Sequence, residues 1–361
     1  RVVMTRIMPL GRRRGRMCEV VAANLPAMSM RAWQVTQHGT PREALRLVDV
    51  EVPEPGPGQV RVRVLASAMN FADSLLCSGE YQVRPELPFT PGLEVCGEVT
   101  AVGPVHEAKG ASQLAVGDRV LGSVALPHGG FAQEALMDVA QTFPAPTGLD
   151  DAHAAALYIG YQTTWFALHR RAAIQPGEWL LVHAASGGVG SSAVQLGKAA
   201  GARVIGVVGG ADKIELAREL GCDHVIDRRE QDIAATVKEI TDGHGADVVY
   251  DPVGGPAYEA STKCIAFEGR ILVIGFASGK RQEARLNHAL VKNYSILGVH
   301  WSLYLEHEPE LVRHCHDELV RLADAGEITP LVGGEVALED VPDALERLVG
   351  GRTVGRLVVL P

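Results

Sequence analysis

The segment between Trp179 and Lys198 constrains the fold more than any other part of the chain. The apolar run Trp179–Ala184 is followed by a turn that reads Ala-Ser-Gly-Gly-Val-Gly-Ser-Ser-Ala, and then by a helical pattern that continues through Lys198. These small residues fit the Gly-x-Gly-x-x-Ala spacing of a strand–turn–helix unit that binds dinucleotides. An empty glycine-rich turn is the alternative, but the flanking strand and helix favour a binding site.

Each small residue of this turn has a physical purpose. Gly188 permits the tight turn, Gly190 lets the backbone approach a diphosphate, and Ala193 allows the helix to pack closely on a sheet. The first N–H groups of the helix have no partner within it and carry partial positive charge, so they attract phosphate oxygens. We therefore predict that the cofactor contacts of the turn are Ser186, Gly187, Gly188, Val189 and Gly190.

The chain divides into two patterns. Between residues 30 and 150, segments such as Gln59–Leu65 alternate apolar and polar residues, and loops rich in Gly and Pro separate them. From residue 150 to about 290, short apolar runs alternate with helical segments such as Ala211–Leu220, which is typical of βαβ units. We expect an α/β fold in which a doubly wound parallel Rossmann sheet accompanies a β-rich domain. The six apolar runs are Trp179–Ala184, Arg203–Val208, Val225–Asp227, Asp247–Asp251, Arg270–Phe276 and Ser295–His300.

The C-terminal segment is expected to return to the first domain. A long helical stretch, Pro309–Ala325, precedes the apolar run Val354–Leu360, which cannot easily join the α/β block. We predict a dinucleotide-binding domain over residues 153–299, inserted into a domain formed by residues 30–152 and 300–361.

Composition excludes several classes of protein. A length of 361 residues indicates about two domains, and 47% hydrophobic with 21% charged residues is ordinary for a globular protein. The net charge of −9 gives no support for a nucleic-acid partner. No uncharged apolar run reaches the length of about 18 residues that a membrane span needs.

The first residues are treated apart from the fold. Residues 1–29 contain six arginines and one acid, Glu19. We interpret them as a disordered extension, with an organellar targeting segment as the alternative.

The cysteines indicate reduced thiols and a cytoplasmic protein. They are scattered, and no two form a Cys-x-x-Cys pair. His314-Cys315-His316 is the only local cluster of metal-ligand types, but neighbours on a helix point in different directions, so we predict no metal site. The six cysteines are Cys18, Cys77, Cys96, Cys222, Cys264 and Cys315.

The end of the second strand of the α/β block distinguishes NADPH from NADH. An NAD site usually carries an acid there, which holds the ribose 2′-hydroxyl. Here Arg203–Val208 ends in Gly209 and Gly210, and Lys213 and Arg228 follow as cations for a 2′-phosphate. Asp212 is the counter-evidence, but its position four residues past the strand is typical of a helix cap. We predict NADPH, with a solvated Lys213 as the alternative.

With these residues the chain resembles the zinc-free quinone oxidoreductases of the medium-chain dehydrogenase/reductase superfamily, from about Met30 to the end. The resemblance implies a GroES-like β-rich catalytic domain split around a Rossmann domain, with the active site between them. It rests on Met69-Asn-Phe-Ala-Asp73, Gly79-Glu-Tyr81, Pro88-Phe-Thr-Pro-Gly92 with Glu94 and Gly97, Gly117-Asp-Arg-Val120, Ala184–Gly190, Asp223-His-Val-Ile-Asp227, Gly275-Phe-Ala-Ser-Gly279 and Lys292-Asn293.

One departure from the wider superfamily bears on the reaction. Zinc alcohol dehydrogenases carry Gly-His-Glu where this chain reads Gly92-Leu93-Glu94. An alcohol needs a Lewis acid to lower its pKa, so a site without zinc is expected to use an acceptor that is already activated. A quinone or an alkene conjugated to a carbonyl spreads the developing charge itself.

The resemblance also implies roles for individual residues. Asn70 and Tyr81 are the candidate catalytic residues: Asn70 as a hydrogen-bond donor near the nicotinamide, and Tyr81 as a substrate contact or proton donor. Asn70 is otherwise a strand-end residue that satisfies loop backbone, and Tyr81 an ordinary wall of the cleft. His300 and Trp301 either line the cleft or lie at the edge of the sixth strand, where the family often forms homodimers. The further cofactor contacts are Thr163 and the backbone of Gly275 and Phe276, at the nicotinamide ring, and Arg352, whose alternative is a position that faces only solvent.

The sequence thus predicts an NADPH-dependent, metal-independent oxidoreductase that reduces a quinone or similar activated carbonyl. One alternative is an NADPH-dependent enone or enoyl-thioester reductase, which also needs a proton donor for the α carbon. Another is a structural or regulatory protein that binds NADPH without turnover.

Overall fold

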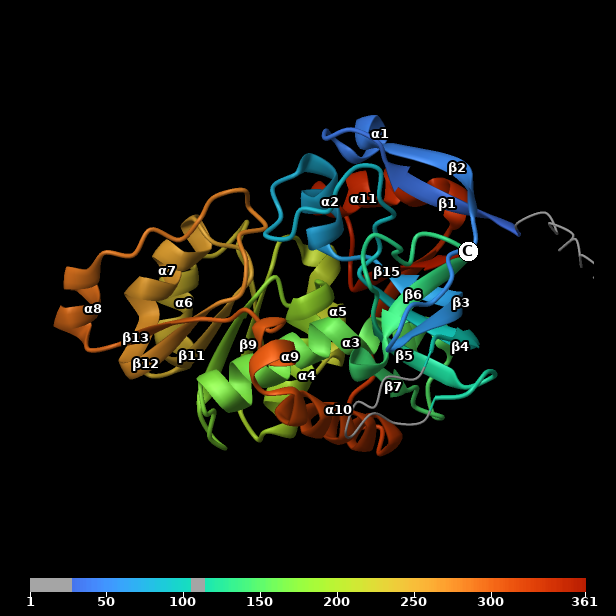
Figure 1. The fold of residues 1–361 in the computed structure, drawn as a ribbon. Coiled ribbons are helices and arrows are strands. Elements are labelled where there is room, and N and C mark those ends of the chain that lie inside the picture. The colour runs from blue at the N-terminus through green and yellow to red at the C-terminus, as the bar shows by residue number, and fades with distance from the viewer. Residues whose placement is uncertain (1–27, 105–113) are drawn as a thin grey trace, which may run out of the picture.

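The structure is a computed structural model that describes residues 28–104 and 114–361. Within them the chain forms a parallel sheet, a mostly antiparallel sheet and a separate two-stranded hairpin (Figure 1). Residues 1–27, which make up most of the predicted extension, lie outside the described residues. Its last two positions belong to the fold, because Ser29 begins a strand and Met28 O accepts a hydrogen bond from Val52 N.

The parallel sheet confirms the predicted Rossmann architecture. Its six strands lie in the order β10-β9-β8-β11-β12-β13, and every neighbouring pair is parallel. The strands are β8 (Trp179–His183), β9 (Arg203–Val208), β10 (His224–Asp227), β11 (Ala246–Asp251), β12 (Ile265–Val273) and β13 (Ser295–Gly298).

Helices cover both faces of this sheet because its strands are apolar on both sides. Leu180 and Val182 of β8 belong to one buried cluster with Val194 of the following helix. Leu181, between them, belongs to another cluster with helical residues on the opposite face, among them Val237. The helices are α4 (Gly188–Ala199), the 3-10 turn η3 (Ala211–Lys213), α5 (Ile214–Glu219), α6 (Ile233–Ile240), α7 (Pro256–Cys264) and α8 (Leu286–Lys292).

The second sheet contains the chain's C-terminal strand, as predicted. β15 pairs antiparallel with β3 through Val358 and Ala68, and parallel with β14. The strands of this sheet are β3 (Gln59–Ala68), β4 (Glu94–Val102), β5 (Arg119–Ser123), β6 (Glu134–Asp138), β7 (Thr142–Pro144), β14 (Val332–Ala337) and β15 (Arg356–Leu360). The hairpin is β1 (Ser29–Val35) and β2 (Leu45–Glu51).

One long helix connects the two sheets. α3 (Asp151–Trp165), which continues as a π-helical segment over Phe166–Arg171, packs against β3 and β4 and against α4 (Figure 1). The predicted boundary between residues 152 and 153 falls at the start of α3, and the exact domain limits remain a prediction. The remaining elements are α1 (Pro41–Ala44), α2 (Phe71–Ser78), α9 (Leu303–His307), α10 (Pro309–Asp324), α11 (Val341–Val349), η1 (Val139–Gln141) and η4 (Leu338–Asp340).

β12 and β13 differ most from the predicted strand limits, and β8, β10 and β11 differ by one residue each. β12 begins five residues before Arg270, because the polar pair Glu268-Gly269 forms an irregularity inside the strand, with Glu268 at φ 57° and a register shift against β11. β13 ends at Gly298, so His300 and Trp301 follow it in a loop.

Candidate cofactor cleft and active site

The glycine-rich turn adopts the predicted strand–turn–helix geometry. β8 ends at His183, Gly187 is the N-cap of α4, and Gly188 is its first residue. A Cβ on Gly190 would overlap the carbonyl oxygen of Ala184, so the turn closes only with glycine there. Ala193 is fully buried, which allows α4 to lie close to the sheet. The unpaired N–H groups of α4 therefore face the carboxyl edge of the sheet, where dinucleotides bind in this fold.

The C-terminal strand brings an unpredicted arginine to this turn. Gly355 N donates to Ser186 O at 2.8 Å, and the side chain of Arg356 lies across Gly188, whose Cβ would stand 2.6 Å from Arg356 Cδ. Arg356 is 5% exposed and forms an ion pair with Glu94. Its Nε has no hydrogen-bond partner among the described residues. A buried guanidinium with a free N–H beside a dinucleotide turn fits a diphosphate, which accepts hydrogen bonds in pairs.

A cationic cavity lies next to the end of β9. It has a volume of about 420 Å³ and contains one carboxylate, Asp212. Lys213 spans it, because its Nζ lies 3.4 Å from Thr353 O on the segment before β15. The predicted residues Lys213 and Arg352 thus come together here, with Arg229 and Arg347 as cations that the sequence did not identify. The cavity is lined by Gly209, Asp212, Lys213, Arg229, Gly333, Arg347, Gly351, Arg352, Thr353, Val354 and Leu357.

The structure explains the glycine at the tip of β9 and corrects one expectation. A Cβ on Gly209 would stand 2.9 Å from Arg228 Nη2, so Gly209 makes room for the predicted cation Arg228. Asp212 was expected to cap the next helix, but η3 and α5 have no side-chain cap. Asp227 anchors this turn instead, because its Oδ1 accepts from Gly210 N at 3.0 Å. The carboxylate of Asp212 caps no helix and lies in the wall of the cationic cavity.

The predicted nicotinamide contacts lie where the central strands end. Gly275 and Phe276 follow β12 and are tied to β11: Gly275 N donates to Asp251 O at 3.4 Å, and Gln282 Nε2 bridges Gly275 O and Asp251 Oδ2. Thr163 is half-buried on α3. No described contact joins Thr163 to Phe276, so their shared role stays a prediction.

Asn70 is held by hydrogen bonds that leave it no free N–H. It is the N-cap of α2, and its Nδ2 donates to Ala68 O at 3.2 Å and to Glu94 Oε1 at 2.9 Å. Both partners only accept, so the amide orientation is fixed by chemistry. The sequence predicted Asn70 as a donor to the substrate. In this arrangement both amide hydrogens are engaged, which favours a role in holding the loop after β3.

Asp73 lies on α2, and Tyr81 follows the end of this helix. Burial raises the pKa of Asp73 to about 7, while N–H groups of Asn70 and Gly92 oppose the shift. Burial, and then the nearby Asp73, raise the pKa of the half-buried Tyr81. No hydrogen bond of the Tyr81 hydroxyl occurs within the described part of the chain. Tyr81 is therefore protonated at neutral pH and has a proton available to donate.

The position of the superfamily's zinc-ligand histidine is apolar. Leu93 packs with Tyr81 against a buried cluster that includes Met69 and Phe131. Elsewhere, His314 is exposed, Cys315 is buried, and His316 stacks on Phe143 with its pKa lowered to about 4 by burial. In residues 28–104 and 114–361, no three His, Cys, Asp or Glu side chains are grouped as a metal site requires.

Trp301 packs inward. It is 6% exposed, its Nε1 donates to Gln162 Oε1 of α3 at 3.1 Å, and its ring meets Tyr158 edge-on. His300, beside it, is exposed. The sequence left open whether Trp301 lines the cleft or lies at the edge of the sixth strand. In the structure its side chain packs in the core beside α3.

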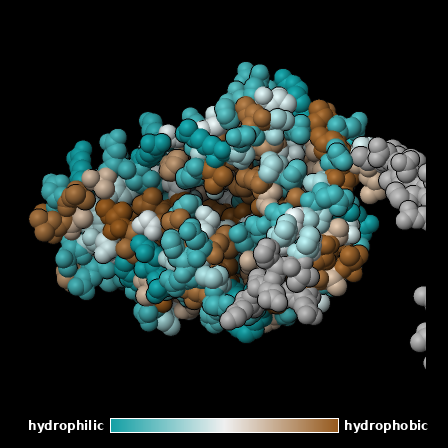
Figure 2. All heavy atoms as spheres, in the orientation of Figure 1, coloured by the Kyte–Doolittle hydropathy of each residue, from teal (hydrophilic) through white to brown (hydrophobic). Residues whose placement is uncertain are grey.

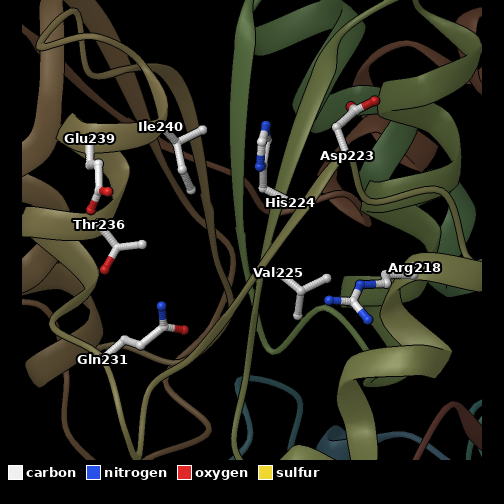
Figure 3. Close-up of a pocket in the computed structure, with 8 residues that line it drawn as sticks. All are labelled: Arg218, Asp223, His224, Val225, Gln231, Thr236, Glu239 and Ile240. Atoms are coloured by element: carbon white, nitrogen blue, oxygen red, sulfur yellow. The ribbon is translucent and has the colours of Figure 1, made fainter.

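The surface has two other features. Figure 2 shows apolar side chains in the hollow between the two sheets and at the end of the molecule that carries α8. A second hollow, of about 480 Å³, lies against the outer strand β10 between α5 and α6 (Figure 3). Its lining, which includes Arg218, Asp223, His224 and Glu239, is mostly polar and shares no residue with the cationic cavity. No helix in the described residues is both long and apolar enough to cross a membrane.

Known proteins share both parts of this architecture. A family model described as "Alcohol dehydrogenase GroES-like domain" matches residues 56–147, and one described as "Zinc-binding dehydrogenase" matches residues 188–317. Quinone oxidoreductase-like protein 2 homolog of Nematostella vectensis is 38% identical over 298 residues, which cover 82% of this chain and 80% of the relative.

Solved structures give the same result. The quinone oxidoreductase of Escherichia coli, solved in complex with NADPH, aligns with a TM-score of 0.83 at 31% identity and covers 92% of this chain and 100% of that one. The enoyl reductase CurK aligns with a TM-score of 0.81 at 26% identity, over 92% of this chain and 99% of that one.

The fold and the site therefore define an oxidoreductase of the medium-chain dehydrogenase/reductase superfamily. Within it, the chain belongs to the quinone oxidoreductase-type family, as the resemblance in its sequence predicted.

Proposed function

We propose that the protein transfers a hydride from NADPH to a quinone or a similar activated carbonyl, without a metal. The cationic cavity beside Gly209 carries the cofactor assignment, because four cations face one carboxylate where a 2′-phosphate would lie. The acceptor class is supported by the relatives, since the Escherichia coli enzyme is a quinone oxidoreductase solved with NADPH. The apolar Leu93 supports metal independence.

Different residues of the chain would bind different parts of the cofactor. The turn Ser186–Gly190 and Arg356 would hold the diphosphate. The four cations of the cavity, with Arg228 beside Gly209, would hold the 2′-phosphate. Thr163, Gly275 and Phe276 would border the nicotinamide, which supplies the hydride when bound. Tyr81 would line the acceptor site and, if the acceptor is an alkene, would offer its hydroxyl proton to the α carbon.

Cofactor consumption with a panel of acceptors tests this proposal. The full chain is assayed in EDTA with NADPH and, in parallel, NADH, using a benzoquinone, a naphthoquinone, an enone and an enoyl-thioester. We expect quinone turnover that is faster with NADPH. Loss of activity in EDTA would contradict metal independence. Tight NADPH binding without turnover of any acceptor would support the non-catalytic alternative.

An alkene reductase is the second candidate, supported by the similarity to the enoyl reductase CurK. This reaction places the hydride on carbon and needs a proton at the α carbon, whereas a reduced quinone takes protons on oxygen from water. Turnover of only the enone or the thioester in the panel would favour this candidate.

The Tyr81→Phe variant separates the two roles of Tyr81. If the hydroxyl donates a proton to carbon, the variant reduces any enone at least about tenfold more slowly and quinones within about twofold of wild type. Single-turnover rates with each acceptor measure this. Equal loss with both acceptors, or no loss with either, would show that Tyr81 only lines the cleft.

We also propose a homodimer formed through the edge strand β13. Among the described strands, β13 pairs with β12 and lies at the edge of its sheet, so a further strand can add to its outer side. Beside it Phe267, Leu286, Leu290 and Val291 are each at least 72% exposed. A two-fold axis lets an edge strand meet its own copy, which would bury these side chains without any other partner.

Light scattering tests this assembly. Leu290→Glu is expected to convert a dimer to a monomer, because the charge would be buried in the interface. Val349→Glu, at an exposed apolar position on α11, is the control and should leave the mass unchanged. A wild-type monomer at about 10 μM would contradict the proposal.

We further propose a cytoplasmic location. The five cysteines within the described residues are all free and buried, which supports a reducing compartment.

A further inference from the structure

The buried carboxylate of Glu94 receives hydrogen bonds from three different elements. Its Oε1 accepts from Asn70 Nδ2, at the start of α2, and from Arg356 Nη2 of β15. Its Oε2 accepts from Ile159 N within α3, at 2.7 Å. Glu94 itself lies on β4 and is fully buried. One side chain thus joins the mostly antiparallel sheet, the connecting helix α3, the loop at Asn70 and the arginine at the glycine-rich turn.

All three partners of Glu94 are donors, so only a carboxylate satisfies them. A glutamine in its place has one oxygen and one NH₂ group. If the glutamine oxygen accepts from Asn70 and Arg356, its NH₂ group faces the N–H of Ile159. If the oxygen instead accepts from Ile159, the NH₂ group faces the donors of Asn70 and Arg356. Either way, buried donors meet buried donors, which is unfavourable.

Glu94 also determines where Arg356 can place its remaining N–H groups. The guanidinium is planar and its donors are rigidly arranged, so a bond from Nη2 fixes the direction of Nε. Arg356 lies against Gly188, and its Nε is buried without a partner in the described structure. The bond to Glu94 therefore keeps a free, charge-assisted donor beside the turn.

We propose that Glu94 is a positioning residue for cofactor binding: by holding Arg356 across the glycine-rich turn, it sets the protein's affinity for the diphosphate of the dinucleotide. This rests on the proposed function only in naming NADPH as that dinucleotide. The cationic cavity around Lys213 is built by other residues and is expected to act independently of Glu94. The two phosphate sites should therefore respond differently when Glu94 is changed.

Isothermal titration with two probes tests the proposal. NADPH carries both the diphosphate and the 2′-phosphate, whereas 2′-AMP carries the 2′-phosphate alone. For Glu94→Gln we expect the Kd of NADPH to rise about tenfold and that of 2′-AMP to stay within about twofold. Glu134→Gln is the matched control, since Glu134 pairs with Arg61 at 2.9 Å and is 18% exposed. It should change neither Kd, although both variants lose a carboxylate from a largely buried ion pair.

Two results would overturn the proposal: an unchanged or lower Kd of NADPH in Glu94→Gln, or an equal loss for both probes. If Glu94→Gln does not fold, Arg356→Lys keeps the charge beside Glu94 but removes the guanidinium, and the same contrast between probes is expected. Binding is measured without an acceptor, so absence of quinone turnover would contradict the proposed function and leave this test intact. If the wild type binds NADH instead, the comparison is made between NADH and adenosine, which carries no phosphate.

Discussion

Replacing Lys213 and Arg352 together with alanine is expected to raise the Kd of NADPH at least about 30-fold and to change the Kd of NADH less than about threefold. Each charge-assisted contact to a phosphate contributes about 1.5–3 kcal/mol, and the lower end applies because Arg352 is exposed. The two cations come from different segments, the turn after β9 and the segment before β15, and Lys213 already reaches Thr353 beside Arg352. Fluorescence titration of the reduced cofactors measures both constants.

Arg218→Ala is the matched control for this variant. Arg218 is also a largely exposed arginine at a surface hollow, the one against β10, and it should affect neither cofactor. Because the contact is electrostatic, the effect of the double substitution should shrink as salt is raised. Equal weakening of NADPH and NADH would mean that the cavity does not hold the 2′-phosphate. A wild type that prefers NADH would mean that Asp212 outweighs the cations.

The second large effect is expected at Gly190. In Gly190→Ala the new methyl group would overlap the carbonyl oxygen of Ala184 and stand 3.1 Å from Ala185 Cα. Both are backbone atoms and cannot rotate away, so the turn must move. Strain of about 1–3 kcal/mol corresponds to about a 5- to 150-fold rise in the Kd of both NADPH and NADH, with a lower Tm.

Gly187→Ala is the control within the same turn. Its φ is −88°, and the nearest atom to a Cβ there would be Ala184 O at 3.2 Å, so the substitution needs only a small adjustment. We expect cofactor binding within about fivefold of wild type. If Gly190→Ala binds both cofactors as the wild type does, the turn does not contact the diphosphate in the way proposed.

The local features of the fold were predictable because they depend on short-range patterns. The apolar runs and the turn around Gly188 identified the parallel sheet, and β9 has the predicted limits, Arg203–Val208. The start of β12 was predicted too late. A hydropathy pattern does not reveal the bulge after Ala266, which keeps Ile265 and Ala266 in the strand. The helix cap expected from Asp212 was wrong: neither η3 nor α5 has a side-chain cap, and Asp227 holds the turn before them through Gly210 N.

The site was predicted only in part, because a sequence pattern does not show which distant residues come together. Lys213 and Arg352 were named from their sequence context, but the sequence did not show that they share one cavity with Arg229 and Arg347. Arg356 was missed, although an arginine at the start of the apolar run Leu357–Leu360 was a usable signal. Glu94 was recognised as part of the family pattern, yet its partners are 24 to 262 residues away along the chain.

The sequence by itself determined the fold class, the dinucleotide turn and the absence of histidine at Leu93, because backbone conformation and residue chemistry are local properties. Only the tertiary structure decided which groups meet: β15 returns to β3, and this places Arg356 across Gly188 and against Glu94. It also showed that both side-chain N–H groups of Asn70 donate hydrogen bonds within the protein, to Ala68 and Glu94. Hydrogen bonds and charge pairs depend on distances of a few ångströms between distant segments, and packing of the whole chain sets those distances.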